Sequence, residues 1–97
     1  MNLYAVINRR GGAYKKSLPL EAQVDWAAHA AFMDALVSDG FVVLGGPLEG
    51  SDDVLLIVRA SSPEEITARF GPDPWVVSGL LHIARISPWT LRLGSLP

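Results

Sequence analysis

The chain has 97 residues, 49% of them hydrophobic, with a net charge of −2 and a mean hydropathy of +0.28, which fits one domain over residues 1–97. The charge balance excludes the basic surface that binds nucleic acid, and the absence of cysteine excludes disulfides, thiolate metal ligands and cysteine nucleophiles. No apolar run reaches the ~18–20 residues of a membrane span and the N-terminus does not resemble a signal peptide, so we expect a cytoplasmic protein with no nucleic-acid or membrane partner.

The first expected element is a strand from Leu3 to Asn8, rich in β-branched and aromatic residues. A long loop, Arg9–Leu18, follows it. The basic residues of this loop bracket Gly11-Gly12, and we interpret them as a solvated loop because no helix start follows the glycines directly. A loop of this length either acts as a lid over a site or is an extra length of chain without a function.

A single long helix is expected next, with Ser17 as its cap, Pro19 in its first turn and Gly40 as its stop after Asp39. A spacing of 100° per residue places His29 on the inward face of this helix. The other inward residues are Trp26, Phe32, Met33 and Leu36. The solvent face is expected to hold Gln23, Ala27, Ala30 and Asp34.

Two continuous apolar runs, Phe41–Leu44 and Val54–Val58, predict a hairpin of buried strands. Between them, Gly45-Gly46-Pro47 interrupts the first run. No helix follows these glycines, so they do not form a phosphate-binding motif. We interpret them as a bulge or a close approach of the backbone that shapes a pocket.

The sequence from Ser62 to Gly71 begins with a capping box and predicts a short helix ending near Phe70. Asp73 can cap a brief helical turn that begins at Pro74 and closes near Gly79. The last strand is expected over Leu80–Ile86, continuing beyond Pro88 through residues 89–93.

This order of elements, strand, helix, strand, strand, helix, strand, predicts an α+β ferredoxin-like fold: a four-stranded antiparallel sheet with two helices on one face. The predicted strands are apolar on both faces, and two helices cover only one. We therefore expect a homodimer that forms through the open sheet face.

His29 is the first candidate for chemistry, because an imidazole has an unperturbed pKa of about 6.5 and carries protons near neutral pH. Two carboxylates can reach it: Asp25, one turn earlier on the helix, and Asp73, held between two prolines before the last strand. A carboxylate on one ring nitrogen would fix the tautomer and make the other nitrogen a general base. The alternatives remain open that His29 is a hydrogen-bonded core residue and that Asp73 is only a helix cap.

The remaining polar residues give weaker signals. His82 lies in the last predicted strand and is interpreted as a cross-strand or interface residue. The spacing of the two histidines does not fit a metal site, so we expect no metal and no other cofactor. The serines lack the context of a nucleophile elbow. Trp26, Trp75 and Trp89 can line a pocket or fill the core.

Taken together, these motifs resemble the YCII-related family. The resemblance covers about Leu3 to Leu93 and rests on His29, Gly45-Gly46-Pro47-Leu48, Ser62-Pro63-Glu64-Glu65 and Asp73-Pro74-Trp75. It implies a dimeric α+β barrel of the muconolactone isomerase type, with a His29–Asp73 pair in a pocket at the dimer interface. It also implies lyase or dehydrochlorinase chemistry on small hydroxylated rings, without metal or organic cofactor.

Three functions are compatible with these observations. The first is a cofactor-independent lyase-, dehydrochlorinase- or isomerase-like enzyme acting on a small aromatic or lactone-like ligand, with His29 and Asp73 as catalytic residues. Its substrate pocket would include Gly46, Pro47, Trp75 and Trp26. The second is a module that binds a small metabolite without turnover. The third is a protein whose only role is to assemble as a dimer.

Overall fold

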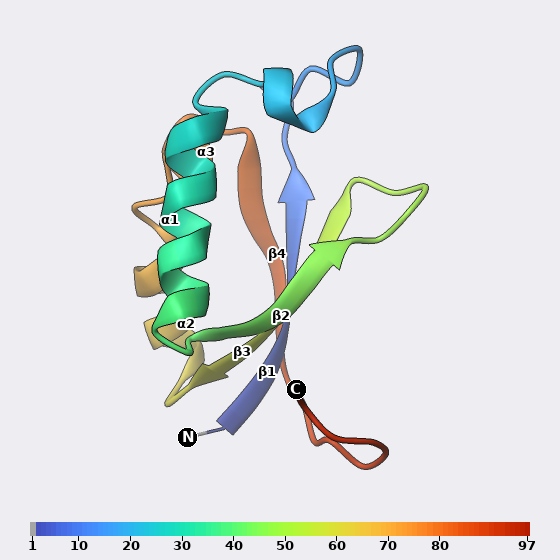
Figure 1. The fold of residues 1–97 in the computed structure, drawn as a ribbon, viewed down its shortest axis with the longest axis vertical. Coiled ribbons are helices and arrows are strands. Elements are labelled where there is room, and N and C mark those ends of the chain that lie inside the picture. Colours follow the sequence, from blue (N-terminus) through green and yellow to red (C-terminus); the bar gives the residue numbers. More distant parts are fainter. Residues whose placement is uncertain (1) are drawn as a thin grey trace.

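The computed structural model describes residues 2–97 as an antiparallel sheet with helices on one face (Figure 1). The strands are β1 (Asn2–Arg10), β2 (Val42–Pro47), β3 (Asp53–Ala60) and β4 (Leu81–Pro88), arranged in the order β2-β3-β1-β4. The helices are α1 (Trp26–Ser38), α2 (Pro63–Phe70) and α3 (Pro74–Val77), preceded by a short 3-10 helix, Leu20–Ala22. The ferredoxin-like α+β fold is therefore confirmed. No helix in the described part of the chain is both long enough and apolar enough to span a bilayer.

The inner strand β1 has side chains on both faces of the sheet. Tyr4, Val6 and Asn8 are buried beneath the helices, whereas the alternate residues Ala5 and Ile7 are half-buried on the face that no helix covers. β1 pairs with β3 and β4, so its inward residues form the middle of the core. The open face is largely apolar at its centre. Its residues from three strands include Leu3, Ala5, Ile7, Leu44, Leu55 and Ile57.

The expected single helix from Pro19 to Asp39 is wrong in its first third. The chain forms the 3-10 helix, breaks at Gln23, and starts α1 only at Trp26, after Asp25 adopts a left-handed conformation with φ 60°. The reason for the break is the Gln23 side chain. It accepts a hydrogen bond from the Lys15 N–H and donates to the carbonyls of Lys15 and Leu18.

Gln23 is consequently buried, and its predicted place on the solvent face is also wrong. Ser17 does not cap the helix, because Pro19 is the residue that precedes the 3-10 helix and no side chain caps it. Ala27 and Asp34 are exposed as expected, and Ala30 is half-buried.

The strands also extend beyond their predicted ends. β2 continues through the glycines to Pro47, and the register irregularity lies between Val42 and Leu44 rather than at the glycines. The close approach is real at Gly45, where a Cβ atom would come within 2.3 Å of Leu56 Cδ2. Residues 89–93 are not a strand, since β4 ends at Pro88.

The buried apolar side chains form two clusters. The larger one, which we call the lower cluster, lies under the C-terminal half of α1 and under α2. It contains Tyr4, Val6, Leu36, Phe41, Val42, Leu56, Val58, Ala60, Ile66 and Phe70. The upper cluster lies at the other end of the sheet and contains Tyr14, Trp75, Leu80 and Leu81.

Candidate active site

His29 is the buried polar residue of α1, with 9% of its surface exposed. Its ring nitrogen Nδ1 lies 2.8 Å from Oδ1 and 2.9 Å from Oδ2 of Asp73. The two residues are 44 positions apart in sequence, and the Asp73 side chain has no exposed surface. The structure thus brings together the two residues expected to form a pair. Asp25 does not take this place; its backbone carbonyl accepts the His29 N–H instead.

Asp73 is fixed by the connection between α2 and α3. Its backbone N–H donates to the carbonyl of Phe70, at the end of α2. Its Oδ1 atom accepts the backbone N–H of Trp75 at 3.0 Å and so caps the first turn of α3. The predicted capping role of Asp73 is therefore real. It does not exclude contact with His29, because one carboxylate has lone pairs for both.

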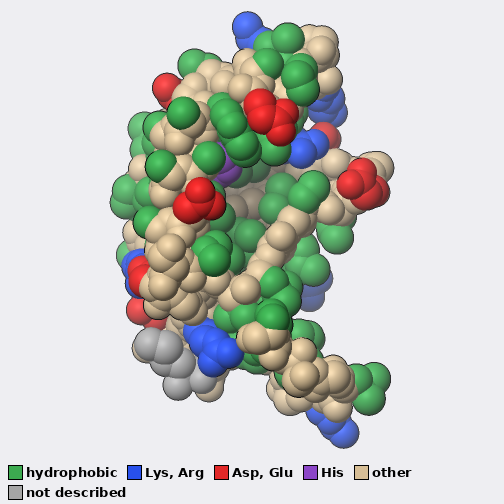
Figure 2. Space-filling view, in the orientation of Figure 1, with side chains coloured by type: hydrophobic (Ala, Val, Ile, Leu, Met, Phe, Trp, Pro, Cys, Tyr) green, Lys and Arg blue, Asp and Glu red, His purple; other side chains and the backbone are tan. Residues whose placement is uncertain are grey.

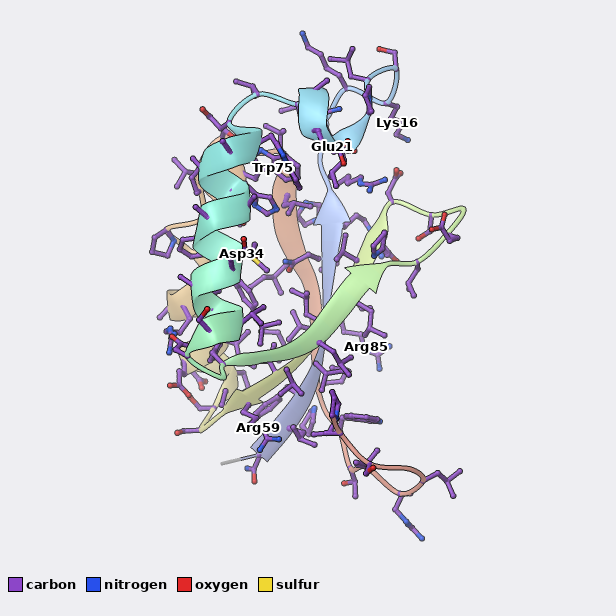
Figure 3. All side chains as sticks on the ribbon, viewed as in Figure 1. Lys16, Glu21, Asp34, Arg59, Trp75 and Arg85 are labelled. Carbon is purple, nitrogen blue, oxygen red and sulfur yellow. The ribbon has the colours of Figure 1, made fainter. Side chains whose placement is uncertain are left out.

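Trp75 forms a flat support for the histidine ring. The two rings are stacked, with centroids 3.9 Å apart and planes 4° from parallel. Trp75 is itself held by a hydrogen bond from its indole nitrogen to the carbonyl of Val24, and Tyr14 packs edge-on against it. Figure 3 shows Trp75 near the N-terminal end of α1. The stacking and the contact with Asp73 together fix the plane of the His29 ring.

The hydrogen-bond pattern determines which nitrogen of His29 is available. An ionised carboxylate only accepts, so Nδ1 must carry the hydrogen that points to Asp73. In the neutral ring the other nitrogen, Nε2, then presents a lone pair, and none of residues 2–97 forms a hydrogen bond with it. This arrangement is what a general base requires: one nitrogen oriented by a fixed acceptor and the other free.

The other predicted site residues are less closely associated with this pair. Trp26 is partly buried, with its ring centroid 6.0 Å from that of His29. Gly46 and Pro47 lie on the edge strand β2, paired with Leu55 and Val54.

Figure 2 shows the surface hollowed between α1 and β2, with a small area of histidine surface at the edge of the hollow. A separate surface cavity of about 560 Å³ lies at the far end of α1, lined by residues such as Val37, Phe41 and Arg69, and contains none of the predicted site residues. His82 is exposed and pairs with Arg9 on the open face. Within residues 2–97, no group of three potential metal ligands is present.

One further buried polar residue lies on the helix-facing side of the sheet and was missed by sequence reasoning. Asn8 is 2% exposed, and its side-chain oxygen Oδ1 has no hydrogen-bond partner in the described structure. The signal in the sequence was a polar side chain at an inward position of an otherwise apolar strand. The sequence pattern ends the strand at this residue and therefore does not reveal its burial.

A comparison with protein-family models identifies a YCII-related domain over residues 4–90. The chain belongs to the YCII-related family. Among solved structures, this YCII-related protein is similar to 5-chloro-2-hydroxyhydroquinone dehydrochlorinase from Burkholderia phenoliruptrix AC1100, determined in complex with 2,5-dihydroxybenzoquinone. The TM-score is 0.59 at 25% sequence identity, and the match covers 95% of each chain. No curated protein matches the sequence.

Proposed function

We propose that this YCII-related protein is a cofactor-independent lyase that acts on a small hydroxylated ring, with His29 as general acid–base and Asp73 as the residue that orients it. The observation that carries the proposal is the geometry of the His29 ring. Nδ1 is held by a fully buried carboxylate, the ring plane is set by Trp75, and Nε2 is left without a protein partner.

Loss of HCl from a chlorinated hydroxyhydroquinone illustrates the chemistry that one such base can perform. Nε2 first takes a ring hydroxyl proton and returns it to the chlorine-bearing carbon, giving the keto tautomer. A second hydroxyl proton then passes to Nε2 while the C–Cl bond breaks and its electron pair leaves with chloride. The ring becomes a hydroxyquinone and the histidine releases the proton to water, so the reaction needs no oxidant. General acid–base catalysis of this kind contributes about 10²–10⁴-fold in rate.

The family and the similarity to a dehydrochlorinase over 95% of both chains support this choice of reaction class. The same geometry also suits proton transfer in an isomerisation of a lactone-like ring. Elimination is preferred because the solved relative is named for it.

The working form is proposed to be a homodimer that buries the open sheet face. Leu3, Ala5, Ile7 and Leu55 are only half-buried there, and Leu44 is 41% exposed. Apolar side chains gathered on one sheet face are the pattern of an interface between subunits. A charged residue at the centre of this face, as in Ile7→Arg, is expected to give monomers in size-exclusion chromatography with light scattering, whereas the wild type elutes as a dimer.

The enzymatic proposal is tested by chloride release from 5-chloro-2-hydroxyhydroquinone. We expect turnover by the wild type and a loss of about 10²-fold or more in His29→Ala. Glu64→Gln, which changes an exposed carboxyl on α2, is the control and should retain wild-type turnover. Full activity in a folded His29→Ala protein would contradict the proposal. Saturable binding of 2,5-dihydroxybenzoquinone without any chloride release would instead identify a metabolite-binding module.

A further inference from the structure

Asn8 presents an unpaired polar atom in the interior of the protein. Its Oδ1 atom is buried without a partner, although the residue lies in the central strand of the sheet. The residues directly opposite it on β3 and β4 are Val54 and Ile83, whose side chains cannot donate a hydrogen bond. A buried carbonyl oxygen is almost always paired with a protein group or an ordered water, so the expected donor to Asn8 Oδ1 is a bound water or a ligand.

On the helix layer, His29 lies between the two clusters. Trp26, one turn before it, packs against the upper cluster. Phe32 and Met33, one turn after it, pack against the lower cluster. The ring of His29 therefore lies at the boundary of the two clusters.

On the sheet, Asn8 lies at the same boundary. Val6, two residues before it on the helix-facing side, belongs to the lower cluster. Arg10, two residues after it, places its guanidinium 4.6 Å from the ring centroid of Tyr14 in the upper cluster. The unpaired side-chain oxygen of Asn8 and the ring of His29 thus both lie where the two clusters meet, one on the sheet and the other on the helix layer.

We infer that Asn8 determines ligand specificity: its side-chain oxygen accepts a hydrogen bond from a ring hydroxyl while the His29 nitrogen acts on another position of the same ring. The inference rests on the proposed function and narrows its substrate class to rings that carry at least two oxygen substituents. A site with a buried acceptor discriminates against an analogue that lacks the donor, because the acceptor is then left unpaired.

The test uses phenol and the three dihydroxybenzene isomers as probes, with dissociation constants from NMR titration of the full chain. We expect the wild type to bind one dihydroxybenzene at least 10-fold more tightly than phenol. Asn8→Val, chosen because a β-branched residue suits a strand between Val54 and Ile83, should reduce this ratio to about 2-fold or less. If Asn8→Val does not fold, the same two dissociation constants are compared in Asn8→Ala.

A second readout separates a ligand contact from a structural role. Removing an unpaired buried amide should raise the Tm of Asn8→Val by about 4–8 °C, whereas an amide satisfied by a buried water would leave the variant less stable. A wild-type ratio retained in the folded variants overturns the inference, and so does a wild type without preference among the probes.

His29→Ala separates this inference from the proposed function, since it should lose chloride release and still prefer the same dihydroxybenzene. If His29→Ala remains fully active, the catalytic proposal is wrong and the selectivity result still decides the role of Asn8. If the Asn8 variants keep the wild-type binding ratio while His29→Ala loses chloride release, the catalytic proposal stands and the inferred contact with Asn8 is wrong.

Discussion

Replacing Asp73 with asparagine preserves the shape of the side chain and removes its charge, which makes it a sharp probe of the His29 tautomer. The asparagine oxygen can still accept the Trp75 N–H, so the cap of α3 survives. The amide nitrogen then takes the place of Oδ2, 2.9 Å from Nδ1, where it can only donate. The oxygen at the Oδ1 position still lies 2.8 Å from Nδ1, but it no longer carries a charge and the amide N–H competes for the same nitrogen. We therefore expect the hydrogen to shift from Nδ1 toward Nε2, which weakens the base without a change in shape.

The expected cost in stability is small. One charge-assisted hydrogen bond, worth about 1.5–3 kcal/mol, is replaced by a neutral one worth about 0.5–1.5 kcal/mol, so the free energy of unfolding should fall by about 1 kcal/mol. For a chain of this size, that shifts the Tm by about 4–8 °C. Asp73→Ala should cost more, about 2–5 kcal/mol, because it leaves both Nδ1 and the Trp75 N–H unpaired in the interior.

The assay combines turnover, thermal unfolding and the ¹⁵N shifts of the His29 ring. In Asp73→Asn we expect chloride release to fall about 10²–10⁴-fold while the hydrogen moves from Nδ1 to Nε2. The reasoning would be refuted by a variant with the Nε2–H tautomer and undiminished turnover. It would also fail if the wild-type ring already carried its hydrogen on Nε2.

Three further predictions concern the parts of the fold that hold the site. Gly45→Ala should lower the free energy of unfolding by about 1–3 kcal/mol in urea, because the new Cβ would lie 2.3 Å from Leu56 Cδ2. In the control, Gly46→Ala, the new Cβ meets nothing within 4 Å, so the free energy of unfolding should change by no more than about 0.5 kcal/mol. Equal effects of the two substitutions would contradict the packing at β2. Gln23→Ala removes three hydrogen bonds to residues 15 and 18 and should cost about 1–3 kcal/mol and speed proteolysis of the preceding loop; an unchanged cleavage rate would count against its anchoring role. The Phe41 N–H, and after it the Arg69 guanidinium, hold the pKa of the exposed Asp39 carboxyl below its ordinary value of 3.8, so its stabilising effect is present above pH 3.8 and is lost as the pH falls through the lowered pKa. The Tm difference between wild type and Asp39→Asn should therefore be largest near neutral pH and vanish in acid. A difference that grows below pH 3.8 would contradict a lowered pKa of Asp39.

Local signals in the sequence predicted those elements whose ends depend on neighbouring residues. The start of α2 is an example: the Ser62 hydroxyl accepts the Glu65 N–H, as the capping-box pattern requires, and the Glu65 carboxylate accepts the N–H of Ser61, one residue before the cap. The start of α1 could not be found in this way. Gln23 is compatible with a helix by propensity, and its hydrogen bonds to the folded loop before it, together with the left-handed backbone of Asp25, accompany the break in the helical path.

The candidate site was predictable to a similar degree. Helical spacing alone gave the inward direction of His29. Its partner required tertiary structure, because Asp25 and Asp73 were both within reach until the turn after α2 placed Asp73 against the ring. The pocket role of Gly46 and Pro47 remains a prediction. Their strand lies across the sheet from β4, and nothing local in the sequence fixes its distance from α1.

Three of the four buried polar or charged side chains in residues 2–97, namely Asn8, His29 and Asp73, occupy positions in the interior where an apolar residue would fit the pattern. A purely structural device would satisfy its own hydrogen bonds, since each unpaired buried group lowers stability. Asp73 does so completely, through Nδ1 of His29 and the Trp75 N–H. Asn8 does not, because its buried Oδ1 has no partner. Nε2 of His29 forms no hydrogen bond with residues 2–97 either, although it is not one of the fully buried atoms. Departures from the folding pattern that leave hydrogen-bonding capacity unused are expected at functional sites, where a ligand completes them. For this reason the unpaired atoms, more than the buried pair itself, support the proposal that the protein binds and acts on a small molecule.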